Sequence, residues 1–105
     1  MNVGDGPGVG GFVRNDDARR YEAFVDDALA GTLTFRLVAG RVVLVHTEVD
    51  PAFEGRGVGG RLAAGALDDI RARGLRARAL CPFVATWVQR HPTYADLVEE
   101  EPAAR

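Results

Sequence analysis

The sequence contains a single cysteine and no lysine, and these two scarcities exclude several classes of protein. One cysteine cannot form a disulfide within the chain, so the disulfide-rich scaffolds of small secreted proteins are excluded. The two histidines and the cysteine lie far apart without zinc-ligand spacing, and we predict no metal site. Every basic residue is an arginine, so the chain cannot modify a lysine of its own.

An excess of one charge and long apolar runs are also missing. The formal net charge is −2, so the chain has no overall basic field with which to bind nucleic acid or an anionic membrane. No stretch approaches the roughly 18 consecutive apolar residues of a membrane span. The start of the chain lacks the basic flank and apolar run of a signal peptide. We therefore expect a cytoplasmic protein, either a monomer or a weak homodimer.

What remains is the composition of one small globular domain, with 105 residues of which 47% are apolar. Residues 1–11 carry five glycines and a proline and offer little to bury, so they predict a flexible tail. Residues 99–105 predict a second, acidic tail. The folded domain is expected over residues 12–98.

Hydrophobic periodicity predicts three strands, a helix, a fourth strand and a second helix, in that order. The expected bounds are Arg19–Val25, Thr32–Val38 and Val42–Val49 for the first strands, 56 or 57 to 73 for the helix, Leu75–Leu80 for the fourth strand and Pro82 for the second helix start. DDALAG, between the first two strands, is expected to be a turn, and the apolar third strand is expected to be covered on both faces. This order favours an α/β (α+β) fold, in which an antiparallel meander crosses right-handed into a parallel strand.

The stretch DPAFEGRGVGGRLAAGALDDI (residues 50–70) places four glycines where the first helix should begin. The first amides of a helix have no intrahelical partner, and the helix dipole adds positive potential there. Glycines remove the Cβ atoms that would keep an anion away from this backbone, and Arg56 and Arg61 could add charged contacts. The glycines alone fit either a phosphate-binding turn or a tight turn that packs a helix close to a strand.

This stretch resembles the acyl-CoA pyrophosphate loop of the GNAT acetyltransferase superfamily, whose signature runs Gln/Arg-x-x-Gly-x-Gly/Ala. A branch of short, single-domain GNAT-like proteins is more closely similar. The similarity lies in the motifs HTEV, GRGxG and CPF, within LVHTEVDPAFEGRGVGGRL (residues 44–62) and CPFVATWVQRHPTYADLV (residues 81–98). The resemblance covers residues 21–98. It implies the GNAT fold and an acetyl-CoA-dependent N-acetyltransferase. The amine acceptor, which is a protein, a peptide or a small molecule, stays unidentified.

The resemblance also implies where acetyl-CoA would bind. Val49 would pair with the pantetheine amides at the end of the central strand. Glu54 stands where the signature has Gln or Arg, and a carboxylate there disfavours a pyrophosphate unless it points away. The amides expected to hold the pyrophosphate are those of Arg56, Gly57, Val58, Gly59, Gly60 and Arg61.

Three side chains are candidates for the chemistry. Cys81 lies between a strand end and a helix start, where the helix N-terminus favours the reactive thiolate. It is a nucleophile that forms an acetyl-cysteine, a polar lining of the thioester tunnel, or a small helix-capping filler. His46 and Glu48 share one face of their strand. Glu48 could act as general base on the acceptor, and His46 could orient Cys81 or take its proton, although both also fit structural roles.

Two aromatic side chains bear on the remaining alternatives. Many GNAT enzymes have a tyrosine acid on the second helix, whereas this helix has Trp87, so the general acid stays unassigned. Trp87 and Phe83 are expected mainly in the core. The alternatives to an enzyme are a CoA-binding module without turnover and a protein-interaction domain whose glycine turn is structural.

Overall fold

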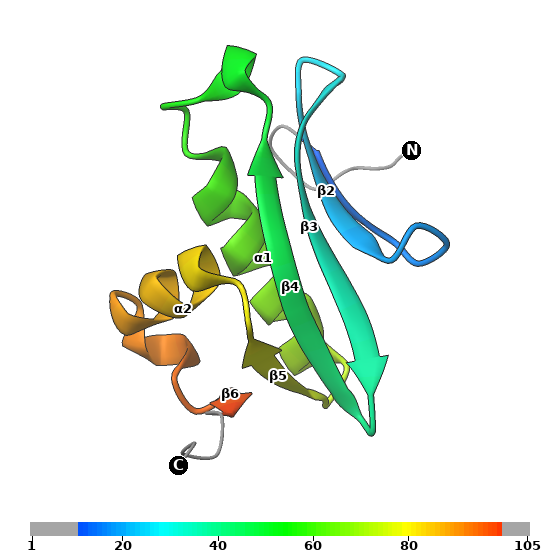
Figure 1. The fold of residues 1–105 in the computed structure, drawn as a ribbon, viewed down its shortest axis with the longest axis vertical. Helices are drawn as coiled ribbons and strands as arrows, with labels where there is room; N and C mark the ends of the chain where they lie inside the picture. Colours follow the sequence, from blue (N-terminus) through cyan, green and yellow to red (C-terminus); the bar gives the residue numbers. More distant parts are fainter. Residues whose placement is uncertain (1–10, 100–105) are drawn as a thin grey trace.

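The computed structural model describes residues 11–99, which form a six-stranded sheet with two helices packed on one of its faces (Figure 1). The strands are β1 Phe12–Asn15, β2 Arg20–Val25, β3 Ala28–Val38, β4 Arg41–Val49, β5 Arg76–Ala79 and β6 Val98–Glu99. The helices are α1 Val58–Ala72 and α2 Pro82–Gln89, with short 3-10 turns η1 Pro51–Phe53 and η2 Pro92–Tyr94. The predicted mixed α/β (α+β) fold class is confirmed.

The strands follow one another across the sheet in chain order. Strands β1 to β4 pair antiparallel, and β4 then pairs in parallel with β5, as the predicted crossover requires. The two edge strands, β1 and β6, were not predicted. They have four and two residues, which is too short for a periodic pattern, and they form by pairing with β2 and β5.

The turn between β2 and β3 is shorter than predicted. Of the stretch DDALAG, only Asp26 and Asp27 form the turn, with φ angles of 50° and 68°, and Ala28 already pairs with Val25. Two central residues with positive φ make the turn that matches the twist of a hairpin, and aspartate tolerates this backbone better than most residues. Ala28 to Gly31 therefore belong to β3.

The described structure includes one residue of each predicted tail. Gly11, assigned to the first tail, accepts hydrogen bonds from the Phe24 amide at 3.0 Å and from the Arg61 guanidinium at 3.2 Å. Glu99, assigned to the second tail, lies in β6, and its carboxylate pairs with Arg41 and Arg76. The rest of the two predicted tails, residues 1–10 and 100–105, lies outside the described residues.

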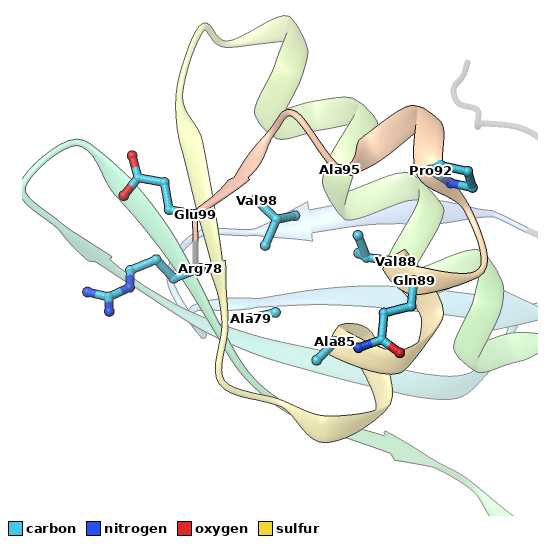
Figure 2. Close-up of a pocket in the computed structure, with 9 residues that line it drawn as sticks. All are labelled: Arg78, Ala79, Ala85, Val88, Gln89, Pro92, Ala95, Val98 and Glu99. Carbon is cyan, nitrogen blue, oxygen red and sulfur yellow. The ribbon is translucent and has the colours of Figure 1, made fainter. Parts of the chain in front are cut away.

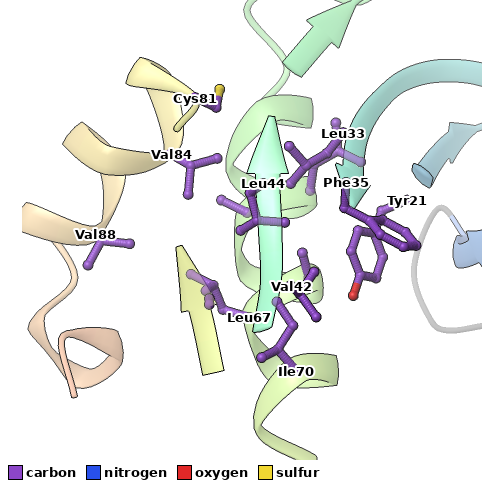
Figure 3. Close-up of a cluster of buried hydrophobic side chains, with 14 of the residues drawn as sticks. Tyr21, Leu33, Phe35, Val42, Leu44, Leu67, Ile70, Cys81, Val84 and Val88 are labelled. Carbon is purple, nitrogen blue, oxygen red and sulfur yellow. The ribbon is translucent and has the colours of Figure 1, made fainter. Parts of the chain in front are cut away.

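Helix α1 buries the apolar stripe that its sequence predicts. Its buried side chains pack with those of α2 and the inner face of the sheet into one core (Figure 3). The helix ends at Ala72, and Gly74 follows its C-cap with a φ of 71°. The Gly74 amide donates to Arg71 O and the Leu75 amide donates to Ile70 O, a pairing that closes helices at a left-handed glycine.

A β-bulge in β4 decides which side chains face the helices. Phe35 pairs with Leu44 and Thr34 pairs with His46, so Val45 is an extra residue without a partner on β3. Because side chains alternate along a strand, one extra residue exchanges the two faces for everything that follows it. Beyond the bulge, Thr47 and Val49 point inward, while His46 and Glu48 are exposed on the outer face. The prediction that this strand is covered on both faces is wrong for its second half.

Asp69 of α1 joins the helix to β1 and β2. Its carboxylate accepts hydrogen bonds from Arg14 at 2.8 Å, from Tyr21 at 2.9 Å and from Arg73 at 3.1 Å. Partial burial alone would raise the pKa of Asp69, but these hydrogen bonds outweigh burial, and the pKa lies below its ordinary value. Burial and the bond to Asp69 also raise the pKa of Tyr21.

We expect Asp69→Asn to lower the free energy of unfolding by about 2 kcal/mol, because the amide cannot satisfy three donors. A depressed native pKa gives stability that is present above the unfolded pKa of about 3.9 and lost as pH falls through the native value. Acid unfolding followed by circular dichroism should therefore show a flatter pH dependence for the variant. Asp68→Asn, which removes a carboxylate with one hydrogen bond, is the matched control. Coincident pH profiles for Asp69→Asn and wild type would contradict this role.

Candidate functional site

The candidate site lies where β4 and β5 separate. The two strands pair from Arg41 to Leu44 of β4, and the Leu44 carbonyl then accepts hydrogen bonds from both Leu80 and Cys81 amides at 3.0 Å. Beyond this point, within the described residues, β4 pairs only with β3. The edge of β4 over residues 45–49 is therefore open on the side that faces α2.

Two helix N-termini flank this open edge. Helix α1 begins after the glycine turn with Gly57 as its N-cap, and helix α2 begins after Cys81. Neither N-cap makes a side-chain capping hydrogen bond, and neither helix has an acidic residue in its first turn. Uncapped first-turn amides and the positive end of the helix dipole favour an anion.

The glycines of the turn serve two different purposes. Gly55 and Gly57 adopt φ angles of 81° and 75°, which residues with a Cβ rarely take. A Cβ at Gly59 would lie 2.8 Å from Cζ of Phe83, and a Cβ at Gly60 would lie 3.3 Å from the indole nitrogen of Trp87. The first pair shapes the turn, and the second pair lets α1 and α2 pack closely.

Two arginines of the turn have different surroundings. The Arg61 amide donates to Gly57 O within α1, and its guanidinium donates to the carbonyls of Gly11 and Phe24. Both parts of Arg61 thus have partners in the fold, which argues against its predicted contact with a pyrophosphate. Arg56 is exposed, with its guanidinium 5.8 Å from the Phe53 ring centroid, and Glu54 is exposed nearby.

Cys81 meets a different partner from the one predicted. Its thiol lies 3.2 Å from the Thr47 hydroxyl, and the residue is only 3% exposed. Figure 3 shows Cys81 at the start of α2, and its amide donates to the Leu44 carbonyl of β4. His46 points to the opposite face of β4 because of the bulge at Val45. The predicted contact between His46 and Cys81 is therefore wrong, and the residue that sequence reasoning missed is Thr47.

His46 and Glu48 lie together on the outer face, as predicted from their spacing. They pair across the strand with Thr34 and Thr32, and both are exposed. Glu48 lines a pocket of about 330 Å³ between the start of β3 and the end of β4. The other lining residues are Arg20, Leu29, Ala30, Gly31, Thr32, Val49, Asp50 and Pro51.

The aromatic side chains are less buried than predicted. Phe83 is 44% exposed and lies against Gly59, so it belongs to the rim of the site rather than to the core. Trp87 is partly buried and stacks on His91 with ring centroids 3.7 Å apart. The Tyr94 hydroxyl donates to Asp68 at 2.7 Å, on the later part of α1 and away from its N-terminus.

A larger hollow of about 410 Å³ lies between α2, η2, strand β5 and the edge strand β6 (Figure 2). Alanine, valine and proline side chains line most of it, and the charged ends of Arg78 and Glu99 point away from it. None of the predicted site residues borders this hollow. Its lining offers no group for acyl transfer, so we place the candidate site at the separation of β4 and β5.

Comparison with known families agrees with this geometry. The profile of the family described as GCN5-related N-acetyl-transferase matches residues 20–97. The chain belongs to the GCN5-related N-acetyltransferase family. The match runs from the start of β2 to just before β6, so it includes the glycine turn, the open edge of β4 and Cys81.

Two proteins from vertebrates are similar in sequence to part of the chain. Protein NATD1 of Bos taurus is 39% identical over 61 residues, which is 57% of this chain and 54% of the relative. Protein NATD1 of Gallus gallus is 38% identical over the same length, 57% of this chain and 56% of the relative. The chain thus matches about half the length of these relatives.

Two solved structures share the fold. A GCN5-like protein from Staphylococcus aureus superposes with a TM-score of 0.63 at 20% identity, covering 83% of this chain and 87% of the other. The ribosomal-protein-S18-alanine N-acetyltransferase of Escherichia coli gives a TM-score of 0.51 at 22% identity, covering 55% and 39%. At these identities the likeness establishes the fold.

Two further findings concern other kinds of site. Among residues 11–99, no group of His, Cys, Asp and Glu side chains is arranged to hold a metal ion. No helix in the same part of the chain is both long and apolar enough to cross a membrane.

Proposed function

We propose that this protein transfers the acetyl group of acetyl-CoA to an amine. The observation that carries this proposal is the open edge of β4 between two uncapped helix N-termini. An acyl-CoA is an extended molecule with a diphosphate, an amide-containing arm and a thioester. The site offers first-turn amides, an open strand edge and a buried thiol in the matching order.

The amides of residues 56–60 are suited to the diphosphate. Gly57, Val58, Gly59 and Gly60 are the N-cap and first-turn positions of α1, where amides have no partner within the helix. Arg56 adds an exposed positive charge beside them. Val49 and the rest of the open β4 edge offer backbone groups to the pantetheine amides, as a neighbouring strand would.

The two faces of β4 divide the chemistry. We propose that the thioester lies on the helix face beside Cys81, and that the amine approaches from the outer face where His46 and Glu48 are exposed. In this proposal the acyl group and the amine meet where β4 and β5 no longer pair, beyond Leu44. Glu48 accepts a proton from the acceptor ammonium, and Cys81 takes the acetyl group as a thioester before the amine receives it.

The experiment is a calorimetric titration with acetyl-CoA, followed by an assay of free CoA thiol with a panel of amines. The panel includes a peptide that begins with alanine, because the Escherichia coli neighbour is described as acting on an alanine. We expect binding, amine-dependent release of CoA and a mass increase at Cys81 that is absent in Cys81→Ala. Thr86→Ala, at an exposed position of α2, is the matched control. Binding with no acetyl transfer to any amine or to Cys81 would identify a CoA-binding module instead, and no binding would overturn both.

We expect Glu54→Gln to bind acetyl-CoA roughly two- to fivefold more tightly, because it removes a carboxylate that repels the diphosphate across solvent. Raising the salt concentration should narrow this difference, since exposed charges are screened. Asp17→Asn is the control, because it makes the same charge change at an exposed position in the β1–β2 turn. Equal affinities of Glu54→Gln and wild type at low salt would place the diphosphate away from Glu54.

A further inference from the structure

We infer that Thr47 is the positioning and proton-relay residue for Cys81, an inference that rests on the proposed acetyl transfer. Within residues 11–99, the Thr47 hydroxyl is the side-chain group that forms a hydrogen bond with the Cys81 thiol, at 3.2 Å. The two residues come from different elements, β4 and the N-cap of α2. Their contact spans the point where β4 and β5 separate.

The fold holds this pair in place from both sides. The bulge at Val45 turns Thr47 inward, where it pairs with the fully buried Leu33 across the strands. The Cys81 amide donates to Leu44 O at 3.0 Å, which fixes the start of α2 against β4. These contacts fix the two backbones relative to each other, at a spacing that lets the sulfur and the hydroxyl lie 3.2 Å apart. The fold therefore places Cys81 Sγ within hydrogen-bond distance of Thr47 Oγ1.

The Thr47 hydroxyl can accept the thiol proton of Cys81, whereas His46 cannot reach the thiol because it lies on the other face of β4. In the transfer, Cys81 Sγ forms a bond to the acyl carbon, and the bond from that carbon to the CoA sulfur breaks. The thiol proton of Cys81 passes to Thr47 Oγ1, while the hydroxyl proton of Thr47 passes to the departing CoA sulfur. The exchange gains and loses no net proton and needs no reactant besides acetyl-CoA.

The test compares Thr47→Val, which keeps the shape and removes the hydroxyl, with Thr47→Ser, which keeps the hydroxyl. Acetyl-Cys81 formation is followed by mass spectrometry in single turnover, and the affinity for CoA is measured by calorimetry. We expect Thr47→Val to slow acetylation by at least about tenfold and Thr47→Ser to retain most of the rate. The affinity for CoA should change little in both, whereas a merely structural role would lower affinity and stability together. Thr86→Val, the same change at an exposed position, is the control.

Alkylation of Cys81 by iodoacetamide without CoA tests the positioning of the thiol by Thr47 separately from the proposed acetyl transfer through Cys81. If wild type forms no acetyl-Cys81, the proposed route through Cys81 fails. Slower alkylation in Thr47→Val, restored in Thr47→Ser, would still support positioning of the thiol by Thr47. Equal alkylation and acetylation rates in wild type and Thr47→Val would overturn the inference.

Discussion

Gly31→Ala should lower the free energy of unfolding by about 3 kcal/mol, the largest loss that we expect from a single methyl group in this protein. Gly31 is buried in β3 beneath the start of α1. A Cβ there would lie 2.8 Å from Cγ1 of Val58 and 2.9 Å from the carbonyl oxygen of Glu48. The carbonyl belongs to β4 and cannot move aside, so α1 must lift away from the sheet or β3 must separate from β4.

The same displacement should weaken acetyl-CoA binding, because Val58 is the first residue of α1 and carries one of the proposed diphosphate-binding amides. Thermal unfolding and calorimetry measure the two effects, and a loss of about 3 kcal/mol corresponds to a melting temperature lower by roughly 15 °C. Gly65→Ala is the matched control. Its nearest contacts all come from the ring of Phe12, which can move at the sheet edge, and alanine favours a helix more than glycine. Equal stability of Gly31→Ala and wild type would show that α1 does not pack tightly on β3 at Gly31.

Sequence patterns that depend only on neighbouring residues predicted most of the secondary structure. Gly74 ends α1 and Pro82 begins α2 because the first takes a left-handed backbone and the second needs no amide partner at a first helical position. The alternating strands and the helical stripe identified every element that is long enough to show a period. The edge strands β1 and β6 exist through pairing with distant residues, which no local pattern reveals.

The candidate site was predictable in its backbone and less so in its side chains. The glycines indicated a turn before α1, and the family resemblance indicated its ligand. The bulge at Val45, in contrast, has no signature in the apolar run of β4, and it alone decides that Thr47 rather than His46 meets Cys81. The partners of the Arg61 guanidinium are likewise Gly11, just before β1, and Phe24 of β2, which the sequence could not place beside α1.

A double-mutant cycle at Gly59 and Phe83 separates the packing role of the glycine turn from its proposed binding role. We expect Gly59→Val alone to cost about 2–3 kcal/mol of stability and to weaken acetyl-CoA binding by at least tenfold. The physical reason is the Phe83 ring, because a Cβ at Gly59 would overlap with it. Either the ring or the first turn of α1 must move, and each borders the site.

In the Phe83→Ala background, Gly59→Val should lose little stability and little affinity for acetyl-CoA. The valine side chain then occupies the space of the missing ring, and the first-turn amides stay in place. Gly60→Val is the control, because its nearest neighbour is Trp87 and its cost should not depend on Phe83. Chemical denaturation and calorimetry on the four proteins give the coupling for stability and for binding. A binding loss that persists after stability is restored would place the ligand itself against Gly59. Losses that stay unchanged in both measurements would mean that Phe83 does not set the spacing of α1 and α2.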